Sequence, residues 1–170
     1  MAESTVLVSV DEYLSTSYKP ACDYLEGVLR SKPMPTWDHS MVQTRVTQLI
    51  NLNFTSFRAA AEVTVRMSPT KYLVPDVVAQ VASQIQRPYP TEPVHLCVEV
   101  LSPDDRMSDA LAKCEEYHAW GVPFVWILDP GVSRAWEFRR GERLHEIPEG
   151  GQLTAGAIAI DANDVFSVIG

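Results

Sequence analysis

The chain lacks any apolar run that approaches the roughly 20 residues needed for a membrane-spanning helix. Its first residues, MAESTVLVSVDEY, have neither a basic stretch nor a cleavable apolar core, so we expect no secretory signal. Cysteine is scarce, because only Cys22, Cys97 and Cys114 occur, all in apolar contexts and without the Cys/His spacing of a zinc site. These features predict a cytoplasmic protein with reduced, buried cysteines and no association with a membrane.

Basic charge is also in short supply. The chain has 14 Lys and Arg residues against 22 Asp and Glu, which gives a net charge of −8 and a pI near 4.9. This balance argues against a general nucleic-acid-binding protein, because neutralising phosphates requires Lys and Arg. It leaves room for an enzyme with a local basic rim, since acidic metal ligands add to the negative total. The candidates for such a rim are Arg30, Lys32, Arg66, Lys71 and Arg106. The alternative is that these residues form an ordinary solvated face.

Common nucleotide and hydrolase motifs are missing as well. The sequence contains no G-x-x-x-x-G-K-[ST], no G-x-G-x-x-G and no G-x-S-x-G. These absences exclude the usual P-loop, dinucleotide-binding and nucleophile-elbow families.

The order of predicted elements indicates one mixed α/β domain over residues 1–170. A short helix capped by Ser9 precedes a hairpin over 22–32, and a long helix capped by Asp38 runs to about residue 60. Strands are predicted at 62–67, 72–81, 94–101 and 123–128, with a helix over 106–120 that makes a right-handed crossover between the last two. The tail is an antiparallel meander (134–138 and 144–147), a strand over 152–160 and a closing helix over 162–168.

Two carboxylates stand inside apolar strands. Asp76 lies in the run LVPDVVAQV and Glu99 lies in VHLCVEVL. Burying a charge is costly unless it is paired or bound to a cation. Carboxylates facing each other on neighbouring strands favour a Mg²⁺ site. The alternative is that either side chain points outward and pairs with a surface lysine.

Three further residues are candidates for the same site. Lys113 shares a helix face with Asp109 and Tyr117, so it forms either a surface pair with Asp109 or a cation placed over the carboxylates. Asp23 becomes a third acidic ligand if the hairpin packs over the site. His39, next to Asp38, is either an acid–base group or a residue that caps and packs the helix start.

An ordered set of short motifs resembles the Uma-type restriction-endonuclease-like family, a branch of the PD-(D/E)XK nuclease superfamily. The resemblance extends from about Ser9 to about Phe138. Its motifs, in order, are VSVDEYL (8–14), DYLEG (23–27), DHS (38–40), VPDV (74–77), EVLSP (99–103) and Lys113…Tyr117…GVP (121–123)…VW (125–126)…DP (129–130).

This resemblance implies a restriction-endonuclease-like core and metal-dependent phosphodiester hydrolysis. It assigns Asp76 and Glu99 as Mg²⁺ ligands, with Asp23 as a further ligand at a position that is usually Glu. The lysine expected two residues after the acid is replaced by Leu101, and the helix lysine Lys113 stands in for it. His39 matches the histidine at the family's helix start.

The sequence hypothesis is therefore a Mg²⁺- or Mn²⁺-dependent endonuclease that hydrolyses DNA, by analogy as a homodimer. Its catalytic set is Asp76, Glu99, Lys113, Asp23 and His39. Two rivals stay open: a catalytically inactive nuclease-fold binding or scaffold protein, and a hydrolase of small phosphate esters.

Overall fold

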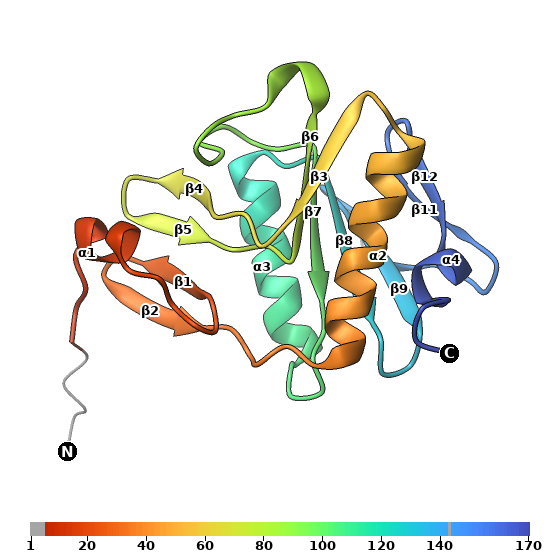
Figure 1. Ribbon diagram of the computed structural model, residues 1–170, viewed down its shortest axis with the longest axis horizontal. Coiled ribbons are helices and arrows are strands. Elements are labelled where there is room, and N and C mark those ends of the chain that lie inside the picture. The colour runs from red at the N-terminus through yellow and green to blue at the C-terminus, as the bar shows by residue number, and fades with distance from the viewer. Residues whose placement is uncertain (1–5, 143) are drawn as a thin grey trace.

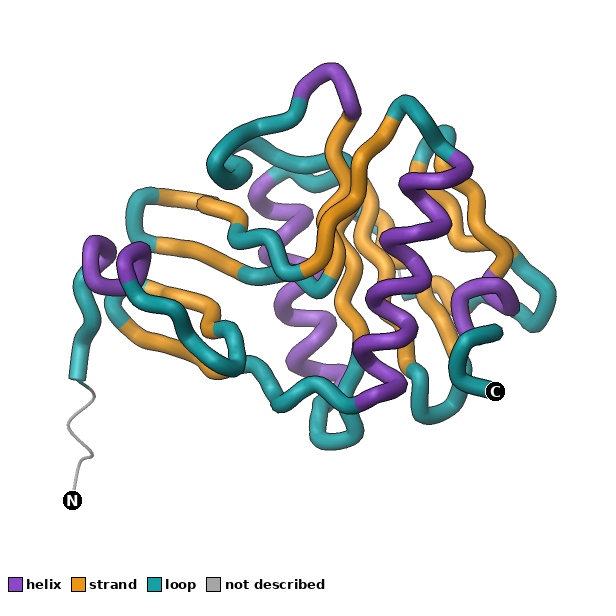
Figure 2. The backbone as a smooth tube through the Cα atoms, viewed as in Figure 1, coloured by secondary structure: helices purple, strands orange, loops and turns teal. Residues whose placement is uncertain are grey.

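The computed structural model describes residues 6–142 and 144–170. Its centre is a six-stranded sheet flanked by two helices, with a smaller four-stranded sheet on one side (Figure 1). Figure 2 shows the same layers by element type. Within the described residues, no helix is both long and apolar enough to cross a membrane.

The central sheet is mixed, as predicted. Its strand order is β10-β9-β8-β7-β6-β3, and only β7 and β8 are parallel. The parallel pair is joined by helix α3, which confirms the predicted crossover. The elements of this layer are β3 (Phe57–Ala61), β6 (Val77–Val81), β7 (Leu96–Val100), α3 (Met107–Trp120), β8 (Phe124–Asp129), β9 (Arg134–Arg139) and β10 (His145–Glu146).

Helices α2 (Trp37–Asn53) and α3 cover opposite faces of this sheet. One core cluster joins α2 to alternate strand residues such as Val77 and Val98, and the other joins α3 to Val78 and Cys97. The alternation follows from the two-residue period of a strand. Glu99 has the same parity as Cys97, so its side chain is on the α3 side.

The second sheet carries the N-terminal hairpin. Its order is β2-β1-β5-β4, and helix α1 with its cap at Ser9 packs against it. The predicted hairpin over 22–32 is confirmed, with Glu26 and Gly27 in the turn. The elements are α1 (Val10–Ser15), β1 (Cys22–Leu25), β2 (Val28–Ser31), β4 (Val65–Ser68) and β5 (Lys71–Leu73).

The single strand predicted over 72–81 is wrong, because the chain divides it between the two sheets. β5 ends at Leu73 in the smaller sheet and β6 begins at Val77 in the central one. Pro75 has no backbone N–H to donate to a ladder, which favours a break at this point. Asp76 is thus the last residue before the central sheet begins.

Helix α2 differs from its prediction at both ends. Its N-cap is Thr36, whose hydroxyl accepts from the His39 N–H at 3.2 Å, whereas Asp38 lies in the first turn. The helix ends at Asn53, and Phe57–Ala61 forms strand β3 instead. The Asn51 side chain donates to the Ala59 carbonyl and accepts from its N–H, both at 2.9 Å, so it holds β3 to the helix.

The C-terminal region contains a hairpin where one strand was predicted over 152–160. β11 (Gln152–Ala155) and β12 (Ile158–Asp161) pair antiparallel and lead into α4 (Ala162–Phe166). Glu137 of β9, only 2% exposed, ties this hairpin to the central sheet. Its carboxylate accepts from the Thr154 N–H, from the Thr154 hydroxyl at 2.8 Å and from Arg139 Nε at 3.0 Å.

Replacing Glu137 by alanine should lower the free energy of unfolding by about 2–3 kcal/mol, because the Thr154 N–H and hydroxyl lose their buried acceptor and Arg139 loses its ion pair. Urea unfolding measures the change. Glu146→Ala is the matched control, since Glu146 pairs with Arg134 in the open and its loss should have a much smaller effect. Equal losses for the two variants would contradict the role given to Glu137.

Candidate active site

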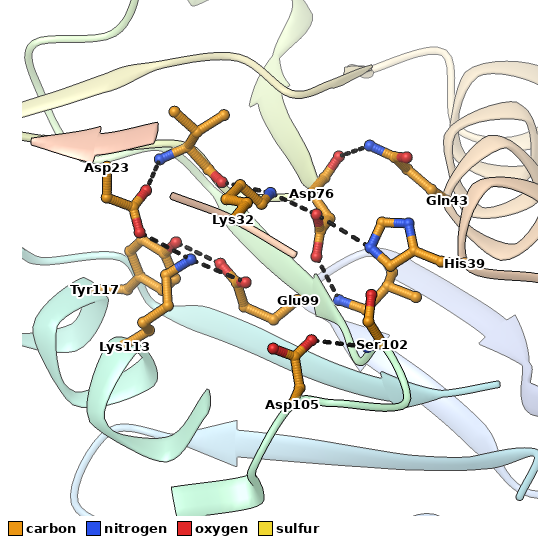
Figure 3. A network of polar contacts seen from close by, with 12 residues as sticks. Asp23, Lys32, His39, Gln43, Asp76, Glu99, Ser102, Asp105, Lys113 and Tyr117 are labelled. Carbon is orange, nitrogen blue, oxygen red and sulfur yellow. Dashed lines mark hydrogen bonds and ion pairs between the residues drawn. The ribbon is translucent and has the colours of Figure 1, made fainter. Parts of the chain in front are cut away.

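The two strand carboxylates face the same side of the central sheet. β6 and β7 pair antiparallel with Val77 opposite Val98 and Val78 opposite Cys97. Extending this register by one residue sets Asp76 opposite Glu99. Both are buried, at 1% and 6% exposure, and both point into one polar network (Figure 3).

Asp76 is held from several directions. Its Oδ2 accepts from the Val100 N–H at 2.7 Å, which closes the end of the β6–β7 pair. Its Oδ1 lies 2.5 Å from Lys32 Nζ and 3.4 Å from His39 Nε2. Gln43 of α2 donates to the Asp76 backbone carbonyl at 2.8 Å. The peptide and side chain of Asp76 are therefore fixed by α2, β7 and the segment after β2.

Glu99 and Asp23 share one lysine. Lys113 Nζ lies 3.1 Å from Glu99 Oε2 and 3.3 Å from Asp23 Oδ2. Tyr117, one turn further along α3, donates its hydroxyl to Glu99 Oε1 at 2.5 Å. Asp23 Oδ1 accepts from the Val74 N–H at 2.8 Å, which joins β1 to the chain just before Asp76.

Burial and charge pairing act in opposite directions on the pKa values of Asp76, Lys113 and Glu99. Burial alone would raise the pKa of Asp76, but His39 and Lys32 outweigh it and hold that pKa well below its usual range. Burial opposes the charge on Lys113, yet Glu99, Asp23 and Asp76 together raise its pKa above the usual lysine value. Burial raises the pKa of Glu99 against the opposing effect of Lys113. Lys113 is thus a permanent cation at neutral pH.

His39 occupies the first turn of α2 with one ring nitrogen toward Asp76. Its Nδ1 is buried and has no hydrogen-bond partner among the residues that the structure describes. The ring lines the same cavity as the carboxylates.

The network opens into a cavity of about 550 Å³. Asp23, His39, Asp76, Glu99 and Lys113, the five residues singled out from the sequence, all line it. Three of the four lysines in the chain (Lys19, Lys32 and Lys113) line it together with Arg30. Six acidic residues line the same cavity (Asp23, Glu62, Asp76, Glu99, Asp105 and Asp109), so the basic side chains gather there without giving the lining a positive net charge.

Other rim candidates lie elsewhere. Lys71 pairs with Glu116 at 2.8 Å, and the guanidinium of Arg66 lies over the Tyr72 ring, 5.9 Å from its centroid. Neither lines the cavity, and nor does Arg106. Lys113 pairs with Glu99 and Asp23 in place of the surface partner Asp109 considered from the sequence.

Sequence reasoning missed two members of the network. Lys32 appeared only as one of several rim charges, and nothing in its local sequence marks a partner 44 positions away. Tyr117 was noted for its helix face and as part of the family motif, without a role in the site. Its spacing of four residues from Lys113 was the available signal, because residues four apart on a helix reach the same neighbour.

The donor set fits a hard divalent cation. Mg²⁺ takes carboxylate and water oxygens and uses only one or two protein carboxylates. Within residues 6–142 and 144–170, no group of three or more His, Cys, Asp and Glu side chains is arranged to hold a metal ion. Asp76 and Glu99 are two carboxylates, the number that Mg²⁺ uses in proteins. In this structure the amines of Lys32 and Lys113 compensate their charge.

The mixed sheet, its flanking helices and the carboxylate–lysine network define a restriction-endonuclease-like α/β protein. The Uma2 family model, described as "Putative restriction endonuclease", matches residues 10–161, and the chain belongs to this family.

A crystal structure from Anabaena variabilis, titled a "putative nuclease belonging to DUF820", has a TM-score of 0.80. The two sequences are 22% identical over 94% of this chain and 98% of the other, so the likeness shows the fold. The DrdV–DNA complex matches at 13% identity over 75% of this chain and 12% of that one. Its TM-score of 0.39 is too low to show a shared fold. No curated protein matches the sequence.

Proposed function

We propose that this protein is a Mg²⁺- or Mn²⁺-dependent endonuclease that hydrolyses DNA phosphodiester bonds. The observation that carries the proposal is the meeting of Asp76 and Glu99 at adjacent strand ends, with the Lys113 amine bound to Glu99 and Asp23 in one cavity. Membership of a family described as a restriction endonuclease agrees with it.

Each residue has a role that its surroundings support. Asp76 and Glu99, with Asp23, are the ligands for the cation. When bound, the cation polarises the phosphate and lowers the pKa of a coordinated water. Lys113 keeps its charge and stabilises the negative charge that develops on the phosphoryl oxygens. His39, whose Nε2 lies 3.4 Å from Asp76 Oδ1, holds that carboxylate in place from the first turn of α2.

DNA is the proposed substrate because the cavity gathers the chain's lysines. Lys19 and Arg30 line the cavity beside the carboxylates and are placed to contact a backbone phosphate that enters it. Cutting both strands of a duplex requires two such sites. The proposal therefore includes a homodimer on duplex DNA.

Plasmid nicking tests the function. Purified protein should convert supercoiled plasmid to nicked circles with Mg²⁺ or Mn²⁺ and not with EDTA, and a dimer should then give linear DNA. Glu99→Gln removes one charged ligand with little change in shape and should slow nicking at least about a hundredfold. Glu146→Gln, in an exposed pair, is the matched control. Equal nicking by wild type and Glu99→Gln would eliminate this mechanism.

One observation favours a second candidate, a nuclease-fold protein that binds without cutting. All six carboxylate oxygens of Asp23, Asp76 and Glu99 already face an N–H, an O–H or an amine of the protein. Such a protein shows no nicking with either metal while it still shifts DNA in a binding assay.

The cavity volume favours a third candidate, a hydrolase of small phosphate esters, because about 550 Å³ lies within the range of small-ligand pockets. Hydrolysis of bis(p-nitrophenyl) phosphate without plasmid nicking would identify this activity.

A further inference from the structure

Lys32 is a buried amine placed directly on Asp76. It follows strand β2 and reaches from the smaller sheet to the start of β6. Its Nζ lies 2.5 Å from Asp76 Oδ1 and donates to the Val74 carbonyl at 2.9 Å. The side chain is only 11% exposed. This contact is therefore a buried, hydrogen-bonded ion pair and differs from an exposed surface pair.

The network contains two lysine amines, those of Lys32 and Lys113, and three carboxylates. Lys113 serves both Glu99 and Asp23, and Lys32 is the only lysine on Asp76. An ammonium and a divalent cation both seek the same negative oxygen. A divalent cation that binds Asp76 Oδ1 must therefore displace Lys32 Nζ from that oxygen.

We propose that Lys32 is an internal counter-ion that competes with the divalent cation for Asp76, sets the metal affinity of the protein and leaves Asp76 when metal binds. The inference rests on the proposed function only in the identity of the cation.

The surroundings of Lys32 allow such a movement. Among the described residues, the Lys32 amine contacts one neutral carbonyl besides Asp76, whereas Lys113 is bound to two carboxylates. The backbone of Lys32 is anchored separately, because its N–H donates to the Ala21 carbonyl at 2.8 Å. The side chain lines the open cavity, so it can turn into that space while β2 stays in place.

The expected size of the effect follows from competition. Apparent affinity equals the intrinsic affinity multiplied by the fraction of molecules in which the site is free. If Lys32 holds Asp76 in about 90–99% of molecules, removing its amine tightens metal binding about ten- to a hundredfold.

Isothermal titration calorimetry with MnCl₂ at fixed pH measures this affinity. Lys32→Met should bind Mn²⁺ at least about tenfold more tightly than wild type. Lys32→Gln keeps a neutral donor beside Asp76 and should also bind more tightly, which covers the case that the methionine variant folds poorly. Lys19→Met is the matched control, because Lys19 lines the same cavity and forms no ion pair with any residue of 6–142 or 144–170, so its loss should change the affinity for Mn²⁺ less than about threefold.

Chemical labelling of the unmodified chain supplies an independent readout. The four lysines can be acetylated with a small N-hydroxysuccinimide ester and quantified by peptide mass spectrometry. Saturating Mn²⁺ should raise the labelling of Lys32 at least about fivefold, since its amine exchanges a buried carboxylate for the open cavity. The labelling of Lys19 and Lys71 should stay constant.

The outcomes separate this inference from the proposed function. Unchanged affinity in both Lys32 variants, or unchanged Lys32 labelling at saturating metal, overturns the inference, whether or not wild type nicks DNA. Tight Mn²⁺ binding by the Lys32 variants supports it even if wild type is inactive. If neither wild type nor variants bind Mn²⁺ at 10 mM or so, both proposals fail.

Discussion

Replacing Lys113 by methionine should slow plasmid nicking about a hundred- to a thousandfold, because the variant loses the one amine that contacts both Glu99 and Asp23. The raised pKa of Lys113 means that wild type carries this positive charge at neutral pH, and methionine cannot supply it. The same substitution removes a positive charge beside two carboxylates. Mn²⁺ should therefore bind at least as tightly as in wild type, as calorimetry can measure.

The matched control is Lys71→Met. Lys71 lies in β5, outside the cavity, and pairs with Glu116 of α3, the helix that carries Lys113. Its loss should leave the nicking rate within about twofold, since this half-exposed pair lies outside the cavity and touches none of the proposed catalytic residues. A Lys113→Met rate within fivefold of wild type, with the variant folded, would remove Lys113 from the mechanism.

Replacing Asp76 by alanine should lower the free energy of unfolding by about 3–5 kcal/mol, one of the largest losses for a single site in this chain. The substitution leaves the buried Lys32 ammonium unpaired and the Val100 N–H without its acceptor. Urea denaturation measures the loss. Adding Lys32→Met to Asp76→Ala should restore part of the stability, because the uncompensated charge is then gone.

Asp105→Ala tests whether this loss is specific. The Asp105 carboxylate accepts from the Ser102 N–H at 2.7 Å in the loop before α3, and it pairs with no lysine or arginine in the part of the chain that the structure describes. Its removal should cost about 1 kcal/mol. A similar loss for both variants, or no recovery in the Asp76→Ala/Lys32→Met double variant, would mean that the ion pair contributes little.

Local patterns predicted the parts of the fold that depend on neighbours in sequence. The hairpin around Gly27, helix α3 with its left-handed C-cap at Gly121, and the β7–α3–β8 crossover all follow from turn residues and apolar periods. The same patterns placed Asp76 and Glu99 on adjacent strands. Their shared side of the sheet depends only on register and alternation.

Features decided by distant contacts could not be predicted in this way. Phe57–Ala61 contains three alanines and continues the helical composition of α2, and it becomes a strand because β6 and Asn51 pair with its backbone. Lys32 follows an edge strand, where lysines are normally exposed. Only the approach of Val74 and Asp76, in the link from β5 to the central sheet, turns it into an ion pair that is largely buried.

The position of Lys113 on a helix, instead of on the strand of Glu99, has a consequence for how this chain tolerates insertions. One residue added between Met107 and Lys113 would rotate the amine by about 100° around the α3 axis, away from both carboxylates. The same residue added among 101–106 can be absorbed by the connecting loop while α3 keeps its packed face. Insertions and deletions compatible with this network are therefore confined to the loop. The first two turns of α3 must keep their length, because they set the position of Lys113 relative to Glu99.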